Sequence, residues 1–159
     1  MKKIFQTAIS GVAVAIALTV AGVPVFAQDA QTLEGAWRVT VTIRNCQTGA
    51  PVRTVLALNT FVPGGSMFET ANGLLRSPSH GTWQKITDHD YTATFMFFTF
   101  NADGSWLGSN KITRTIMLSE DHQMFTAAAS VEVFDASGKL IATGCATEAA
   151  QRFEWMARD

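Results

Sequence analysis

The sequence predicts an all-β fold, an eight-stranded antiparallel up-and-down barrel. Residues typical of turns (Gly, Pro, Asn, Asp and Ser) recur at short, fairly even intervals, and the runs between them are rich in Thr, Val, Ile, Phe and Trp. Helical periodicity is nearly absent after the first 27 residues. Many short strands separated by turn signals are typical of antiparallel folds. Eight such strands can hide their edges by closing into a barrel, and a β-sandwich is the alternative.

The expected strands follow from the turns and from alternation of apolar and polar residues. Trp37, Val39, Val41 and Ile43 share one side of the first run, which is typical of a half-buried strand. In the seventh run, alternate residues from Phe125 to Val133 are all apolar. The expected strands are 35–45, 52–62, 65–71, 80–87, 90–101, 105–118, 122–134 and 139–153.

The N-terminus has the organisation of a cleaved export signal. Lys2 and Lys3 precede an uncharged apolar run from Ala8 to Val23, and Val25-Phe26-Ala27 follows Pro24 with small residues where a signal peptidase cleaves. The run is shorter than the roughly 20 residues that a spanning helix needs. We expect a signal peptide over 1–27, a single domain over 28–159, and no membrane span after cleavage. The expected destination is the periplasm or the extracellular medium.

Charge and motifs exclude several classes of function. The chain has 12 Lys and Arg against 13 Asp and Glu, and no basic cluster follows the signal segment. A nucleic-acid partner is not expected, because the phosphate backbone requires a clustered basic face. The sequence also lacks a Gly-x-Ser-x-Gly motif, a His-Glu-x-x-His motif and a phosphate-binding loop. We therefore expect no cofactor and no bound metal.

Cys46 and Cys145 are the only cysteines. An even count in an exported protein predicts one disulfide, with two free buried thiols as the alternative. The pairing fits a barrel, whose first and last strands are neighbours. Cys46 is out of phase with the Trp37 to Ile43 side of its strand. It must lie in the loop past the strand, or a bulge must intervene.

Two sequence segments resemble known families. Leu33-Glu34-Gly35-Ala36-Trp37 resembles the Gly-x-Trp opening of the first strand in lipocalins and the wider calycin superfamily, and Thr87-Asp88-His89-Asp90-Tyr91 resembles their second motif. That resemblance implies a barrel, a Trp packed across one barrel end and an apolar ligand. The segments 44–49, 81–83 and 143–147 resemble a group of small secreted bacterial proteins of unassigned function.

The candidate binding site is the barrel interior. Small residues on expected inward faces, such as Ala57, Ala127 and Ala129, would leave an apolar pocket, whereas a filled barrel is the alternative. The predicted lining residues are Trp37, Val39, Phe95, Phe97, Ile112, Arg114 and Ala129.

Arg114 is the most specific candidate among them. It shares a face with Ile112 and Ile116, and if that face is inward the guanidinium needs a carboxylate or a bound anion. Glu69 and Glu132 are the candidate internal partners. In the competing register, Lys111, Thr113 and Thr115 point inward and Arg114 lies outside.

Polar turn residues form a second candidate. In a meander, the turns at 63–65, 87–90 and 119–122 share one barrel end, which collects four carboxylates and two imidazoles (Asp88, His89, Asp90, Glu120, Asp121 and His122). Such a set suits a divalent metal or acid–base chemistry, but these residue types also dominate ordinary turns.

The leading functional hypothesis is an exported barrel that binds a small, largely apolar molecule, including one that bears a carboxylate. One alternative is a small barrel enzyme, an isomerase or cyclase that uses a rim acid–base pair. Another is a protein-interaction module that uses the outer side chains Met96, Phe98 and Phe100. The sequence leaves the ligand, the oligomeric state and the inward register open.

Overall fold

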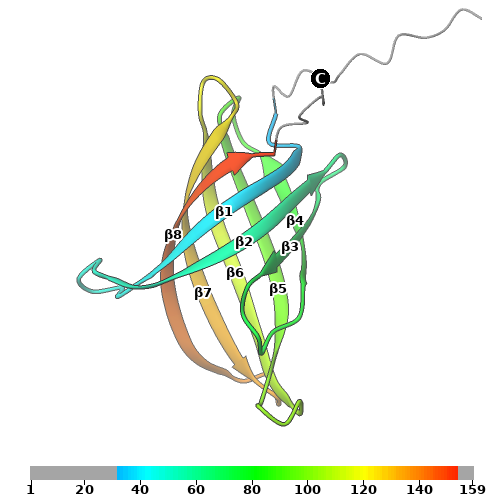
Figure 1. The fold of residues 1–159 in the computed structure, drawn as a ribbon, viewed down its shortest axis with the longest axis vertical. Coiled ribbons are helices and arrows are strands. Elements are labelled where there is room, and N and C mark those ends of the chain that lie inside the picture. The colour runs from blue at the N-terminus through cyan, green and yellow to red at the C-terminus, as the bar shows by residue number, and fades with distance from the viewer. Residues whose placement is uncertain (1–31, 154–159) are drawn as a thin grey trace, which may run out of the picture.

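The computed structural model describes residues 32–153, which form a closed barrel of eight antiparallel strands (Figure 1). The expected signal peptide and its cleavage site lie outside the described residues. No helix among residues 32–153 is both long and apolar enough to cross a membrane. The strands are β1 (Gly35–Arg44), β2 (Pro51–Val62), β3 (Ser66–Ala71), β4 (Ser79–Lys85), β5 (Asp90–Phe100), β6 (Trp106–Leu118), β7 (Met124–Asp135) and β8 (Leu140–Arg152).

The predicted fold class is confirmed, and the sandwich alternative is wrong. Each strand pairs with the next along the chain, and β1 pairs with β8 from Trp37↔Arg152 to Arg44↔Cys145, which closes the barrel. All eight expected strands are present, with ends displaced by two residues at most. Closure pairs β1 with β8, so neither the first nor the last strand forms a free edge of the sheet.

Buried side chains fill one end of the barrel, where β1 begins and β8 ends; this end is at the top of Figure 1. Trp37 is fully buried there, packs edge-on against Phe125 at 4.9 Å, and donates its indole N–H to the Leu33 carbonyl at 2.9 Å. The Arg152 guanidinium lies 4.2 Å from the Trp37 ring and donates to the carbonyls of Glu34 and His122. Burial lowers the pKa of Arg152. We call this the closed end.

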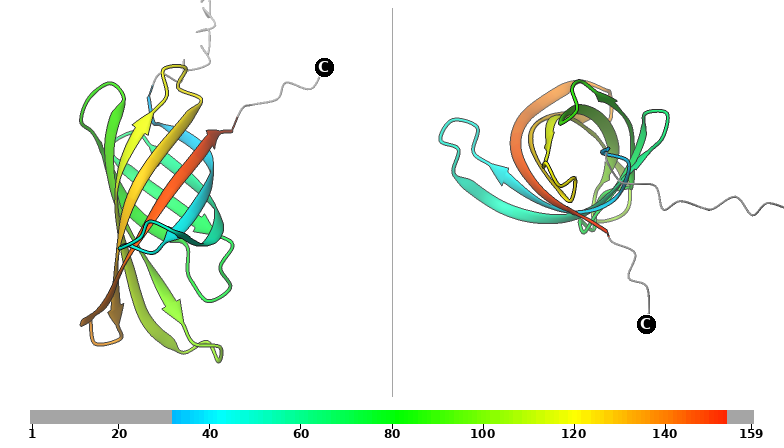
Figure 2. Two further views of the ribbon diagram at one scale, coloured as in Figure 1. Left: turned by 90° about the vertical axis from the view of Figure 1, so that its left-hand side faces the viewer. Right: turned by 90° about the horizontal axis from the view of Figure 1, so that it is seen from above.

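The opposite end, which we call the open end, carries the loops β1–β2, β3–β4, β5–β6 and β7–β8 (Figure 2). The predicted disulfide is present here: Cys46 and Cys145 are bonded, with Cα atoms 5.4 Å apart. Cys46 lies in the loop past β1, and Cys145 points outward from β8. The bond spans 99 residues, and a loop of about that length is expected to stabilise the fold by about 2–5 kcal/mol. Disulfides are typical of oxidising compartments and fit a periplasmic or extracellular protein.

A glycine allows close packing where β4 meets β5. Gly81 pairs with Phe95, and a Cβ added at Gly81 would lie 2.4 Å from the Phe95 Cβ and 2.2 Å from the Thr94 carbonyl oxygen. A residue with a side chain would force the two strands apart. Gly81 therefore lets the Phe95 ring lie against the inner wall of the barrel.

Candidate functional site

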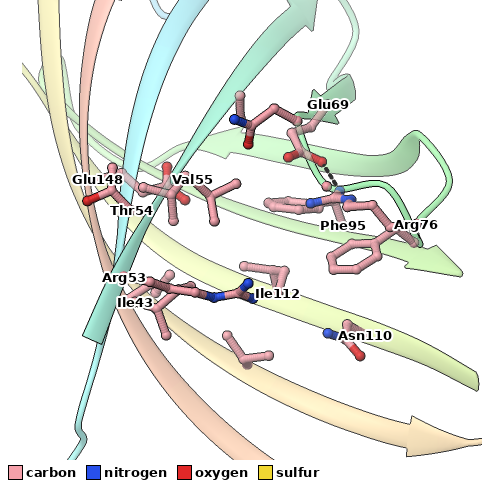
Figure 3. Close-up of a pocket in the computed structure, with 18 of the residues that line it drawn as sticks. Ile43, Arg53, Thr54, Val55, Glu69, Arg76, Phe95, Asn110, Ile112 and Glu148 are labelled. Carbon is pink, nitrogen blue, oxygen red and sulfur yellow. Dashed lines mark hydrogen bonds and ion pairs between the residues drawn. The ribbon is translucent and has the colours of Figure 1, made fainter. Parts of the chain in front are cut away.

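The open half of the barrel encloses a cavity of about 550 Å³ (Figure 3). This volume lies within the usual range of sites for small molecules, roughly 300–1,000 Å³. Side chains from the strands and from the β3–β4 loop line it. The apolar wall consists of Val41, Ile43, Val55, Ala57, Leu74, Leu75, Phe95, Phe97, Ile112, Ala129, Val131 and Ala146. The interior is thus a hollow in its open half and a packed core in its closed half.

Five of the seven predicted lining residues border this cavity, namely Phe95, Phe97, Ile112, Arg114 and Ala129. Trp37 and Val39 do not, although both are fully buried. They belong to the packed core at the closed end. Alternation on β1 correctly predicted that both face the barrel interior, but it could not predict their position along the barrel axis.

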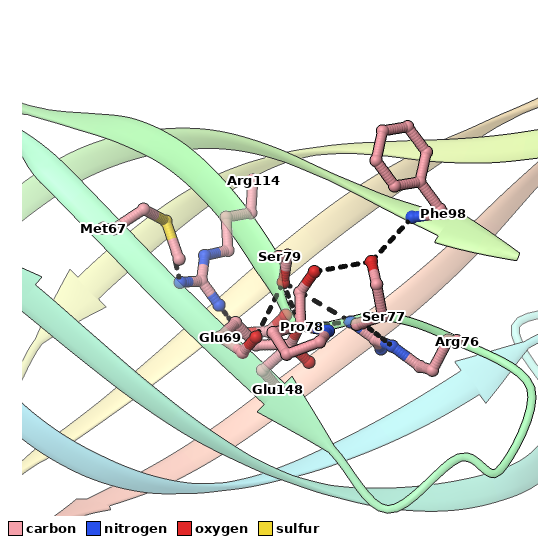
Figure 4. A network of polar contacts seen from close by, with 9 residues as sticks. All are labelled: Met67, Glu69, Arg76, Ser77, Pro78, Ser79, Phe98, Arg114 and Glu148. Carbon is pink, nitrogen blue, oxygen red and sulfur yellow. Dashed lines mark hydrogen bonds and ion pairs between the residues drawn. The ribbon is translucent and has the colours of Figure 1, made fainter.

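Arg114 lies at the floor of the cavity. The alternative in which Lys111, Thr113 and Thr115 point inward and Arg114 points outward is therefore wrong. Arg114 is 2 % exposed, and its Nη1 donates to Glu148 Oε2 at 2.6 Å (Figure 4). When the Asn59 amide oxygen faces the guanidinium, it lies 2.9 and 3.1 Å from the two terminal nitrogens. The rings of Phe61, Phe95 and Phe125 surround the guanidinium carbon at 5.0–5.9 Å.

Neither predicted internal partner of Arg114 is the correct one. Glu132 lies on the outside and pairs with Lys111 at 2.8 Å, and Glu69 belongs to another cluster. A buried guanidinium is costly unless a charge partner and further hydrogen bonds offset its desolvation. Glu148 and Asn59 supply both. The positive charge of Arg114 is therefore already balanced within the protein.

A second ion pair joins the β3–β4 loop to the cavity wall. Glu69 accepts hydrogen bonds from Arg76 and from the Ser79 hydroxyl, and Glu69 is 5 % exposed (Figure 4). The Arg76 guanidinium also lies over the Phe97 ring, 3.6 Å from its centre. These contacts hold the loop against the barrel and neutralise the charge of Arg76.

Among the charged and amide side chains at the cavity, those of Arg53 and Asn110 have no partner within residues 32–153. Arg53 lines the cavity from β2 and forms no hydrogen bond or ion pair with those residues (Figure 3). Asn110, on β6, has a buried Oδ1 without a hydrogen-bond partner. The five ionisable side chains around the cavity are thus three arginines and two glutamates, and the surplus positive charge is that of Arg53.

Sequence reasoning did not identify Arg53, Arg76 or Glu148, and it assigned Glu69 to Arg114 instead of to Arg76. The sequence could have predicted an inward position for Arg53, because Arg53, Val55 and Ala57 alternate on the same face of β2. Glu148 likewise alternates with Ala146 and Ala150. For Arg76 there was no periodic signal, because it lies in a loop.

The predicted cluster of turns is at the closed end, opposite the cavity. His89 and His122 stack there with ring centres 5.5 Å apart, and His89 Nε2 lies 3.5 Å from Glu120. A hydrogen bond from Lys85 holds the pKa of the Asp88 carboxyl below its ordinary value. Within residues 32–153, no three His, Cys, Asp or Glu side chains are grouped so as to hold a metal ion. An acid–base pair on this rim would not reach a ligand in the cavity.

Comparisons with known proteins identify no family for this chain. No protein-family model matches the sequence, and no curated protein sequence matches it. The cavity is therefore the feature of this protein that indicates a function.

Proposed function

We propose that this protein binds a small, largely apolar molecule that carries one anionic group, such as a carboxylate. The apolar body would occupy the cavity, and the anionic group would lie at the mouth beside Arg53. The observation that carries this proposal is the uncompensated charge of Arg53 in an otherwise balanced, mainly apolar cavity. The resemblance of Gly35-Ala36-Trp37 to the lipocalin opening is consistent with it.

The proposal changes the anchor expected from the sequence. Arg114 was the candidate for the anion, but Glu148 and Asn59 already satisfy its terminal nitrogens. An anion placed there would lie beside the Glu148 carboxylate, and like charges at close range repel. Arg53 has no carboxylate partner among residues 32–153, and its side chain is exposed, so a ligand can reach it.

Export belongs to the same proposal. The Lys-Lys start, the apolar run and the Ala27 boundary support a cleaved signal peptide, and the disulfide supports an oxidising destination. The protein used in the binding experiment is therefore the mature chain, whose mass is expected to show Gln28 as its first residue.

Titration with a dansyl-labelled undecanoic acid, followed by fluorescence, tests the anchor. Arg53→Gln should weaken binding about five- to tenfold, since a hydrogen bond to a charged group contributes about 1.5–3 kcal/mol before exposure reduces it. The methyl ester of the probe should bind the parent protein more weakly and should not respond to Arg53→Gln.

Arg38→Gln is the matched control, because Arg38 is an exposed arginine on the outer face of β1. It should leave the dissociation constant unchanged. Equal affinity for acid and ester, or equal losses in the two variants, would contradict the role of Arg53. Failure of both acid and ester to bind would refute the proposed function itself.

A further inference from the structure

We propose that the open end docks onto an anionic lipid bilayer through an apolar patch beside the cavity mouth. The patch, which we call the portal patch, consists of Leu74, Leu75, Phe98 and Trp106. This inference extends the proposed function by naming the surface from which an apolar anion would enter. It can fail separately, because docking and ligand binding are measured independently.

The portal patch is exposed, and its loop is fixed to the strand that carries Phe98. Leu74 is 99 % exposed, and the other three members are each about half exposed. Ser77 ties the loop to β5, because its amide donates to the Phe98 carbonyl at 3.0 Å and its hydroxyl accepts from the Phe98 amide at 3.0 Å (Figure 4). The rings of Phe98 and Trp106 are in edge contact at 6.3 Å. Four exposed apolar side chains grouped on one side of the cavity mouth are typical of a surface that meets an apolar partner.

The patch adjoins the cavity directly. Leu74 and Leu75 both line the cavity as well as the outer surface. The loop that bears them spans residues 72–78, between two short strands. An apolar ligand that passed beside this loop would move from a bilayer to the cavity with little exposure to water.

The charge distribution of the described residues selects the bilayer as partner. At the closed end five carboxylates (Glu34, Asp88, Asp90, Glu120 and Asp121) outnumber the two basic residues Lys85 and Arg152. At the open end Glu69 neutralises Arg76, and the remaining basic residues Arg44, Arg53 and Lys139 outnumber the carboxylates of Asp103 and Asp135. An anionic surface attracts the open end and repels the closed end, with about 1 kcal/mol for each basic residue near the surface. An apolar patch beside basic residues is typical of interfacial binding.

Co-sedimentation with vesicles of phosphatidylglycerol and phosphatidylcholine tests this inference. Leu74→Asp should lower the vesicle affinity at least about tenfold, because it removes a leucine that membrane contact would bury and adds a repelled charge. Binding should also weaken as salt is raised and as phosphatidylglycerol is replaced by phosphatidylcholine.

Leu58→Asp is the matched control, since Leu58 is 52 % exposed on the outer wall of β2 and the charge change is the same. It should alter vesicle affinity by no more than about twofold. Brominated lipids should quench Trp106, and Trp106→Phe should remove that quenching. Leu74→Asp should still bind the dansyl-labelled acid without vesicles.

The inference is overturned if the parent protein does not bind the anionic vesicles, or if both aspartate variants lose affinity equally. It is also overturned if Leu74→Asp abolishes a concentration-dependent dimer seen by sedimentation instead, which would make a second copy the occupant. Vesicle binding without binding of the dansyl-labelled acid would leave the docking surface standing and refute the proposed function. Binding of the dansyl-labelled acid without vesicle binding would refute the docking surface and leave the proposed function standing.

Discussion

The buried ion pair between Arg114 and Glu148 depends on small neighbours. Arg114 on β6 pairs across the sheet with Ala129, and Glu148 on β8 pairs with Ala127. Both alanines lie on the inner face of β7, between the two charged residues. Larger side chains there would separate the guanidinium from the carboxylate. The alanines that the sequence suggested as pocket space thus also make room for the ion pair.

Removal of one partner of this pair should lower the free energy of unfolding far more than removal of both partners. Glu148→Leu leaves the Arg114 charge buried, and the free energy of unfolding should fall by about 3–5 kcal/mol. The double variant Arg114→Met/Glu148→Leu should recover most of that loss, because neither charge is then buried. Urea denaturation followed by fluorescence measures both. A loss below about 1 kcal/mol for Glu148→Leu would mean that Arg114 is solvated or paired elsewhere.

At the scale of elements, Asp side chains organise the hairpin turns. Asp135, at the end of β7, accepts hydrogen bonds from the Ser137 hydroxyl and from the backbone amides of Ser137 and Lys139. The Ser137 hydroxyl and these amides hold the pKa of the Asp135 carboxyl below its ordinary value of 3.8. Asp103 has the same arrangement with Ser105 in the β5–β6 turn.

The β7–β8 turn should therefore contribute to acid sensitivity. A carboxyl whose pKa is lower in the folded chain stabilises the fold above its unfolded value and loses that contribution as pH falls through its folded value. Asp135→Asn should reduce stability above about pH 5, and its difference from the parent should vanish at lower pH. Thermal unfolding at a series of pH values measures this. A difference that is constant with pH would show that ionisation of Asp135 does not stabilise the turn.

At the scale of the whole molecule, the barrel combines a packed half and a hollow half. Trp37, Phe61 and Phe125 fill the closed end with mutual ring contacts of 4.9–6.2 Å. The cavity occupies the other half, and the disulfide joins the first loop to the last strand at that end. The packed half supplies most of the buried apolar surface, so the hollow half can hold a ligand.

Filling the hollow should block binding without unfolding the protein. Ala146 lines the cavity and Ala149 is exposed on the outer face of the same strand, β8, so the two positions form a matched pair. Ala146→Phe should weaken binding of the dansyl-labelled acid by about tenfold or more, because the ring would take the space of the ligand. Ala149→Phe should bind normally. Normal binding by Ala146→Phe would place the ligand outside the cavity.

The sequence determined those features that depend on local pattern. Alternation and turn residues located all eight strands, and a period of two assigned Phe95, Phe97, Ile112 and Ala129 to the inner face. The even cysteine count predicted the disulfide. The strand and face assignments need only the side of a strand on which a residue lies, and the neighbouring residues in the sequence determine that side.

Only the tertiary structure decided the height of each residue along the barrel and its partner across the interior. Alternation along a strand does not predict how far along the barrel axis a residue lies. The tilt and stagger of all eight strands set the level at which each residue meets the others. Trp37 therefore lies in the packed end, and Glu148, 34 residues from Arg114, is its partner. Arg76 reaches Glu69 only because the β3–β4 loop folds back onto β5. That same stagger leaves Arg53 at the mouth, where the proposed function rests on it.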